Sequence, residues 1–142
     1  HIALHLSEAA VAAWIADPER IVLVGAAADA PETLLGYAMY ETAATPEAPV
    51  TERLGDVPAG HLSKLYVLAE GRGTGLAEAL VHDGVERLRR LGFRHVWLGT
   101  NAQNARANRF YERLGFETVG ARQFVVGGER VEDDWVRLLT VE

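Results

Sequence analysis

The feature that most constrains the fold of this chain is a change of hydrophobic period at Gly75. Leu62–Leu68 is predicted as a strand, with the period of 2 that strands show, whereas apolar residues after Gly75 recur with the period of 3.6 that marks one helix face. That face comprises Leu76, Leu80, Val81, Gly84, Val85, Leu88 and Leu91. Between the two patterns lie Gly71, Gly73 and Gly75. Glycines let the backbone turn sharply and approach a ligand, and the helix that follows exposes N–H groups that can bind an anion.

The rest of the chain shows the same alternation of strand and helix patterns. We expect further strands at Ile21–Ala28, Leu34–Glu41, Arg94–Gly99, Phe116–Val126 and Arg130–Val141, and further helices at Ser7–Ala16 and Asn104–Leu114. Turns are predicted at Asp29–Glu32 and at Gly127–Gly128. Thr42–Gly60 holds three of the five prolines and no clear period, so we predict a long loop of the kind that often binds ligands. The order predicts an α/β sheet of about six strands with helices packed on it.

Composition bounds the class of protein. The 142 residues, of which 49% are hydrophobic and 24% charged, fit one globular domain spanning residues 1–142. The absence of cysteine excludes a disulfide framework, a thiolate zinc site and a cysteine nucleophile. A net charge of −6 argues against a nucleic-acid partner and weakly favours a cationic substrate. The basic cluster Arg87, Arg89 and Arg90 falls in the last turn of a predicted helix, where cations are favourable in any case.

Targeting signals are also missing from the sequence. No apolar run approaches the roughly 18 to 20 residues of a membrane span, and no basic segment precedes an apolar one as in a signal peptide. We therefore expect a cytoplasmic protein without a membrane partner. Because the chain starts at His1 rather than Met, we also expect residues upstream of it. No two histidines have the spacing of metal ligands on a shared face, so no metal is expected.

The glycine segment can be compared with known phosphate-binding patterns. The chain has no Gly-Lys pair, which excludes the G-x-x-x-x-G-K-[ST] loop. The dinucleotide pattern G-x-G-x-x-G fails because Leu76 or Glu78 would occupy its last position. A simple glycine-rich turn before a helix remains a possible reading. The pattern that does match is Arg72-x-x-Gly75-x-Ala77.

This pattern resembles the acyl-CoA pyrophosphate loop of GNAT acetyltransferases, [RQ]-x-x-G-x-[GA]. The resemblance implies that backbone amides of the loop and helix start bind the pyrophosphate, with Arg72 opening the motif. The implied amides belong to Gly73, Thr74, Gly75, Leu76 and Ala77.

A second segment strengthens the resemblance. Residues 104–116, NARANRFYERLGF, are similar to the family signature N-x-x-A-x-x-[FL]-Y-x-x-x-G-F. The resemblance implies that Asn104 contacts the pantetheine arm, with Ala107 as the small residue of the motif, and that Tyr111 is the general acid for the departing thiolate. Arg106 and Arg109 are candidates for contacts with the CoA phosphates. The alternative for Tyr111 is an amphipathic tyrosine packed between helix and sheet.

Leu65-Tyr66-Val67 precedes the glycine loop. The family resemblance implies that the acyl-CoA arm pairs with this strand, from Leu65 to Val67, and that the N–H near Val67 polarises the thioester carbonyl. The alternative is an ordinary buried strand. Many relatives carry a glutamate as general base where this chain has His61. Histidine suits that role, because its reference pKa is about 6.5, although an exposed residue at a strand start is the plainer reading.

The resemblance carries expectations for the whole chain. It implies a GNAT-type mixed, mainly antiparallel sheet of six to seven strands, with helices on both faces, a splayed central strand pair, and the first strand and helix missing before Ser7. It also implies a homodimeric enzyme that transfers an acetyl group from acetyl-CoA to a primary amine of a polyamine-like small molecule or a peptide. Trp97-Leu98 and the tail motif Asp134-x-Val136 are most similar to the bacterial branch that includes polyamine acetyltransferases.

Two alternative functions remain open from the sequence. The same fold can serve as a non-catalytic acyl-CoA sensor, to which the histidine at position 61 points, or as an interaction domain without CoA affinity. The acidic run Glu132–Asp134 either attracts an amine substrate or forms a solvated hairpin.

Overall fold

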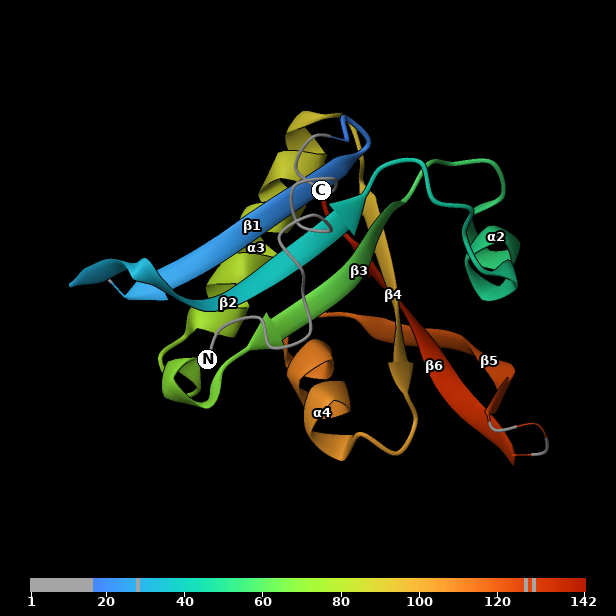
Figure 1. Ribbon diagram of the computed structural model, residues 1–142. Coiled ribbons are helices and arrows are strands. Elements are labelled where there is room, and N and C mark those ends of the chain that lie inside the picture. The colour runs from blue at the N-terminus through green and yellow to red at the C-terminus, as the bar shows by residue number, and fades with distance from the viewer. Residues whose placement is uncertain (1–16, 28, 127, 129) are drawn as a thin grey trace. The chain divides into compact units, whose positions relative to one another are not determined.

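A computed structural model describes residues 17–27, 29–126, 128 and 130–142 of the chain. These residues form β1 (Arg20–Ala27), β2 (Ala30–Glu41), β3 (Gly60–Val67), β4 (His95–Asn101), β5 (Glu117–Val126) and β6 (Arg130–Thr140), with helices α2 (Ala48–Leu54), α3 (Leu76–Arg90) and α4 (Ala105–Arg113) and a short 3₁₀ helix η1 (Ala69–Gly71). The strands are hydrogen-bonded in the order β1-β2-β3-β4-β6-β5 (Figure 1). The predicted mixed sheet is confirmed, whereas the helix predicted at Ser7–Ala16 lies outside the described residues.

The chain groups into two compact units. Unit 1 comprises the described residues within His1–Ala43 and Leu62–Gly92, and unit 2 comprises those within Ala44–His61 and Phe93–Glu142. In unit 1, β1 and β2 form the predicted antiparallel hairpin, and α3 packs on both strands. The turn predicted at Asp29–Glu32 is shorter than expected, because β2 already starts at Ala30 and pairs there with Ala27 across an irregular end.

Tyr40 of β2 packs against α3 in the interior of unit 1. Tyr40 is fully buried, and its hydroxyl donates to the carbonyl of Leu80, 2.9 Å away, in α3. Gly84 lies one turn further along the same helix face, and a Cβ placed there would overlap the Tyr40 ring. The apolar spacing of the sequence correctly placed Gly84 on the inner face of the helix.

Replacing Gly84 with alanine is therefore expected to lower the free energy of unfolding by about 2 kcal/mol. Alanine in a helix interior would otherwise be favourable by about 1 kcal/mol, but a ring anchored by its own hydroxyl cannot move aside cheaply. Urea denaturation measures the effect, with His82→Ala, at an exposed position of the same helix, as the control. A Gly84→Ala variant as stable as the parent would contradict this packing.

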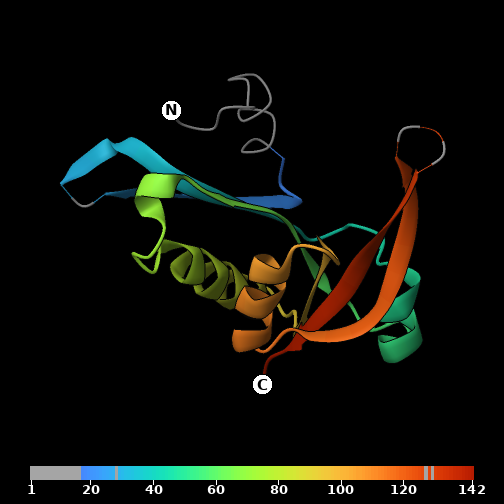
Figure 2. The ribbon, with the colours of Figure 1, turned by 90° about the horizontal axis from the view of Figure 1, so that it is seen from below.

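Unit 2 has helices on both faces of its strands. β4 and β5 each pair antiparallel with β6, and side chains alternate between faces along β6. Val136 and Leu138 pack in a core cluster with Val50 of α2, whereas Arg137 bonds to α4. Figure 2 shows α2 and α4 on opposite faces of these strands. β3 joins β4 in parallel through two pairs only, Gly60↔Val96 and His61↔Trp97.

Helix α2 corrects the prediction of a long loop at Thr42–Gly60. Pro49 lies in its first turn, where a missing N–H is harmless, and Val50 is 1% exposed. Opposite it, Gly120 follows a bulge in β5, and a Cβ there would lie 2.6 Å from Pro49. The helix has only seven residues, with few apolar positions, so its sequence shows no usable period.

Candidate active site

The glycine-rich loop follows β3 in unit 1 and is fastened at its start. The Leu68 N–H donates to the carbonyl of Leu35 in β2, 2.7 Å away, and η1 then turns the chain. Gly71 is buried at the end of η1, where a Cβ would lie 3.0 Å from the Val67 side chain. Val67 and Leu65 are half-buried in β3. The side chain of Val67 thus has a packing role, as the buried-strand alternative predicted.

Beyond Gly71 the loop is exposed. Gly73 and Gly75 have φ angles of +76° and +85°, a region that disfavours other residues, and a Cβ at either would meet nothing within 4 Å. Both glycines therefore leave open space in front of the loop. Arg72 is also exposed.

The start of α3 is open to an anion. Gly75 is its N-terminal cap residue and no side chain caps the helix. The first helical bond runs from the Ala79 N–H to the Gly75 carbonyl, so the N–H groups of Leu76 and Ala77 precede the ladder. The Leu76 N–H donates to the Thr74 hydroxyl at a long 3.3 Å. The donor set, the helix dipole and the clear space fit a pyrophosphate group.

The second predicted segment forms α4 in unit 2. Asn104 is its N-cap, and Oδ1 of its side chain accepts a hydrogen bond from the Ala107 N–H, 3.1 Å away. The signature Asn-x-x-Ala is thus also a capping motif, because its two ends bond to each other. Ala107 is half-buried, whereas Arg106 and Arg109 are exposed.

A buried polar network fixes α4 to β6, and the sequence reading missed it. Arg137 is 3% exposed and donates to the Asn108 side chain, the Phe116 carbonyl and the Glu112 carboxylate at 2.9 to 3.0 Å. Asn108 in turn donates to the carbonyls of Asn101 and Asn104. The only sequence signal was a second asparagine one helical turn after the cap.

Arg137→Met is expected to lower the free energy of unfolding by about 2 kcal/mol, since it leaves the Asn108 oxygen and a buried carbonyl without a donor. Arg53→Met is the matched control. Arg53 also pairs with a glutamate, Glu117, but both side chains are mostly exposed, and such pairs contribute about 0 to 1 kcal/mol. Equal losses in the two variants, measured by thermal and urea unfolding, would refute the importance of the buried network.

Tyr111 lies on α4 among aromatic rings. The ring centroids of Phe110 and Phe116 are 5.2 and 5.7 Å from its own. In the described part of the chain no group hydrogen-bonds to its hydroxyl. Burial raises the pKa of Tyr111 to about 12, so the phenol keeps its proton at neutral pH. The Tyr111 ring is therefore packed, as the alternative of an amphipathic tyrosine predicted, while its hydroxyl keeps a proton that it can donate in a hydrogen bond.

The plainer reading of His61, as an exposed residue at a strand start, is wrong. His61 is half-buried, and its ring stacks on that of Trp97 with centroids 3.8 Å apart. The stack holds the imidazole in a defined orientation. Trp97 packs with Val50 of α2 and with Leu138, its partner in the β4–β6 ladder, so the imidazole lies on the face of unit 2 that carries α2.

Asp134, the last residue of the acidic run near the end of the chain, is buried. Asp134 is 7% exposed and accepts two bonds from Arg122, at 2.9 and 3.0 Å. Arg122 also donates to Glu47, at the start of α2. Burial opposes the guanidinium charge, but the two carboxylates outweigh it and raise the pKa of Arg122. Asp134 is thus a buried ion-pair partner rather than part of a solvated hairpin.

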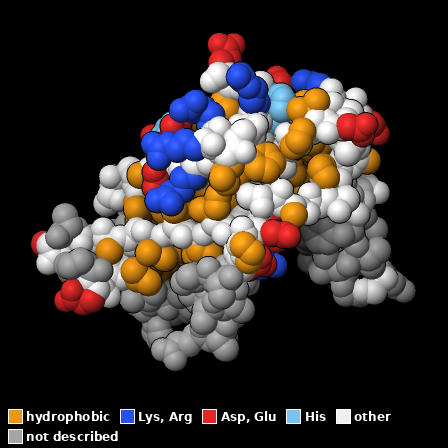
Figure 3. Space-filling view, turned by 90° about the horizontal axis from the view of Figure 1, so that it is seen from above, with side chains coloured by type: hydrophobic (Ala, Val, Ile, Leu, Met, Phe, Trp, Pro, Cys, Tyr) orange, Lys and Arg blue, Asp and Glu red, His pale blue; other side chains and the backbone are white. Residues whose placement is uncertain are grey.

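The arginines of α3 are paired within their own helix. Arg87 lies 3.9 Å from Asp83, and both Arg89 and Arg90 reach Glu86. In the space-filling view, basic side chains lie near acidic ones and beside apolar surface rather than forming a uniform basic face (Figure 3). This arrangement is typical of a helix surface.

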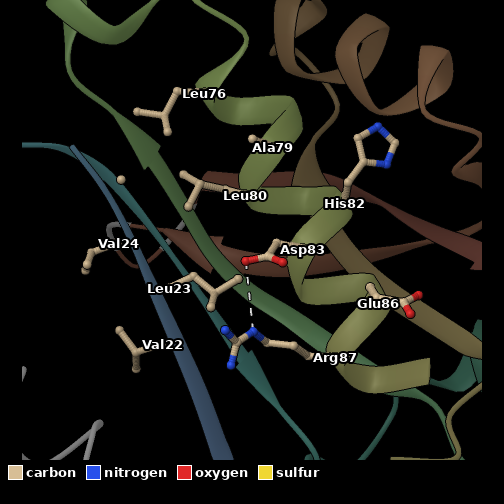
Figure 4. A pocket seen from close by; sticks show the side chains of 11 residues that line it. Val22, Leu23, Val24, Leu76, Ala79, Leu80, His82, Asp83, Glu86 and Arg87 are labelled. Carbon is tan, nitrogen blue, oxygen red and sulfur yellow. Dashed lines mark ion pairs between the residues drawn. The ribbon is translucent and has the colours of Figure 1, made fainter. Parts of the chain in front are cut away.

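Unit 1 also carries a shallow groove between β1 and α3. Its lining includes Val22 and Val24 of β1 and Leu80 of α3, with the Asp83–Arg87 ion pair at one side (Figure 4). Of the predicted site residues only Leu76 borders it. The groove is therefore not the site that the sequence motifs predict.

Two kinds of feature are absent from the described residues. No helix among them is long and apolar enough to cross a bilayer. Within the same residues, no group of three or more histidines and acidic side chains is placed to hold a metal ion.

The elements that the motifs predict are present in the described residues: a mixed six-stranded sheet, an open loop before α3 and a capped helix that carries Tyr111. Residues 3–116 match the acetyltransferase (GNAT) family, and the chain belongs to this family. Family membership favours an enzyme over a plain interaction domain.

Individual relatives agree with this assignment. An uncharacterised N-acetyltransferase of Mycobacterium tuberculosis is 37% identical over 132 residues, which cover 93% of this chain and 74% of that protein. A mycothiol acetyltransferase of Parafrankia is 40% identical over 91 residues, 58% of this chain but 28% of its own length. The crystal structure of a GNAT acetyltransferase from Elizabethkingia anophelis with acetyl-CoA bound has a TM-score of 0.66 at 11% identity, covering 95% of this chain and 84% of that one. It supports the fold.

Proposed function

We propose that this enzyme transfers an acetyl group from acetyl-CoA to a primary amine of a polyamine-like small molecule or of a peptide. The observation that carries the proposal is the exposed loop with two glycines at positive φ, directly before a helix start that no side chain caps. A bound acetyl-CoA in the structurally similar Elizabethkingia protein supports the choice of donor.

Unit 1 supplies the groups proposed to hold the donor. The amides from Gly73 to Ala77 bind the pyrophosphate, because aligned N–H groups at a helix start attract negative charge. Arg72 adds an exposed cation beside them. Along Leu65–Val67 the pantetheine arm pairs with the strand backbone, and the N–H near Val67 donates to the thioester oxygen as negative charge develops there.

Unit 2 supplies the groups proposed to act in the reaction. The amine nitrogen attacks the thioester carbon, a C–N bond forms, and the C–S bond breaks to release CoA thiolate. His61 takes the proton that the nitrogen loses. Asn104 and Arg109 contact the CoA moiety. Binding two substrates in one orientation contributes much of the acceleration, since it removes the entropy cost of bringing them together.

Tyr111 acts in this scheme as a hydrogen-bond donor to the departing sulfur. A thiol has an ordinary pKa of about 8.5, far below the pKa of about 12 that burial gives Tyr111. Complete transfer of the phenol proton to a thiolate is therefore unfavourable. A hydrogen bond from the neutral phenol stabilises the developing charge without that transfer.

The acceptor is proposed from charge and from the relatives. A net charge of −6 favours a cationic amine. The partial similarity to a mycothiol acetyltransferase is consistent with a small-molecule acceptor. We further propose that residues 1–142 act as one catalytic domain, in a cytoplasmic homodimer.

Acceptor-dependent release of CoA tests the proposal. The enzyme is mixed with acetyl-CoA and, in separate reactions, with spermidine, a neutral hydroxyl compound of similar length, and a peptide with a free N-terminus. Free thiol is followed over time, and the product mass is measured. Acetylated spermidine or peptide supports the proposal, whereas thiol release that is independent of every amine contradicts it.

A further inference from the structure

The imidazole of His61 lies flat against the indole of Trp97. The ring centroids are 3.8 Å apart and the planes differ by only 8°. The two residues are also backbone partners, in the second of the two pairs that join β3 to β4. Side chains at paired positions of neighbouring strands lie on the same face of a sheet, so strand pairing and ring stacking reinforce each other.

Trp97 is held in place independently of His61. It is 2% exposed and belongs to the core cluster with Val50, Val136 and Leu138. Leu138 is also its partner across the β4–β6 ladder. Because packed cores hold side chains in single rotamers, the indole presents a fixed plane to the imidazole.

Packing alone does not explain an indole at this position. Nε1 of Trp97 is buried and has no hydrogen-bond partner among the described residues. An unpaired buried donor is a rare feature that needs a reason, and a phenylalanine or leucine would fill much of the same space without one. What the indole offers here is a broad aromatic face beneath His61.

We propose that Trp97 is a positioning residue for His61. The indole face restrains rotation of the imidazole about its bond to Cβ. The ring plane therefore keeps one orientation, and the base meets the acceptor amine in that orientation. Such orientation raises kcat and leaves the binding of acetyl-CoA unchanged. The inference rests on the proposed function, in which His61 accepts the amine proton.

Two substitutions at position 97 separate the aromatic face from core volume. Trp97→Phe and Trp97→Leu both remove the N–H and shrink the side chain, but only phenylalanine keeps an aromatic face. We expect Trp97→Leu to lower kcat about 10-fold with the KM for acetyl-CoA within about 2-fold, and Trp97→Phe to keep at least about half of kcat.

A double variant tests whether Trp97 acts through His61. His61→Ala is expected to lower kcat about 30-fold, and adding Trp97→Leu to it should cause no further loss, because the group that the indole positions is gone. Val50→Ala is the structural control, since it opens the same cluster without touching the stack. Two results would overturn the inference. One is a Trp97→Leu variant with the kcat of the parent enzyme. The other is a double variant whose loss of kcat equals the product of the losses in the two single variants.

Proton NMR supplies a readout that does not depend on turnover. The indole ring current should move the His61 ring protons upfield, and Trp97→Leu should return them to ordinary positions. Unshifted His61 protons in the parent enzyme would overturn the inference even if the enzyme is active. An enzyme that acetylates no amine would instead refute the proposed function and the base role of His61 with it.

Discussion

Replacing Tyr111 with phenylalanine is expected to lower kcat for acetyl transfer by about 100- to 1,000-fold, the usual contribution of a positioned hydrogen-bond donor to developing negative charge. The KM for acetyl-CoA should change little, because the hydroxyl acts on charge that develops as the C–S bond breaks. Stability should be retained, since the ring keeps its contacts with Phe110 and Phe116 and no described group bonds to the hydroxyl. Steady-state kinetics over a range of acetyl-CoA concentrations measure both parameters.

Tyr40→Phe is the matched control for this substitution. The Tyr40 hydroxyl is buried and donates to the Leu80 carbonyl, so its removal should cost about 1 kcal/mol of stability and leave kcat unchanged. The pH profile adds a second check. With the pKa of Tyr111 raised to about 12 by burial, the phenol stays protonated and kcat should show no loss from this group between pH 7 and 10. Full turnover by Tyr111→Phe would exclude the proposed role.

Gly75→Glu is expected to weaken acetyl-CoA binding by at least about 100-fold, because it brings a side chain of five heavy atoms that ends in a carboxylate to the proposed pyrophosphate position. The protein itself should tolerate the side chain, since a Cβ at Gly75 meets nothing within 4 Å. An acidic residue at a helix start is even favourable towards the dipole. The remaining cost is backbone strain at φ +85°, about 1 to 2 kcal/mol.

Gly128→Glu controls for that strain. Gly128 has a φ of +84° and open space around its Cβ, and it follows β5 in unit 2 rather than the loop before α3. It should lose a similar amount of stability and bind acetyl-CoA normally. Equilibrium titration of both variants against the parent measures the difference. Equal affinities in Gly75→Glu and the parent would place the pyrophosphate elsewhere.

The sequence predicted those elements in which local signals and tertiary packing agree. Period-2 and period-3.6 patterns located the strands and α3, and the two glycine-flanked motifs located the loop before α3 and the helix that carries Tyr111. Helix α2 escaped prediction because its stability comes from contacts made by Val50 and Pro49 with distant strands. A seven-residue helix has too little local signal to be recognised without them.

Long-range polar contacts were beyond the reach of sequence reading for the same reason. Arg137 and Asp134 lie in an exposed-looking charged strand, yet both are buried because Asn108 and Arg122 come from other elements to meet them. The stack of His61 on Trp97 likewise depends on the register of β3 with β4, which no local pattern specifies.

Calorimetric titration of the unmodified chain with acetyl-CoA is the most direct test of the proposed donor site. We expect saturable binding at one site per chain, with an affinity that falls as ionic strength rises because charged phosphates contact the helix start and Arg72. A folded chain that takes up no acetyl-CoA at millimolar concentration would contradict it, and the two motifs would then be traces of ancestry rather than a working site.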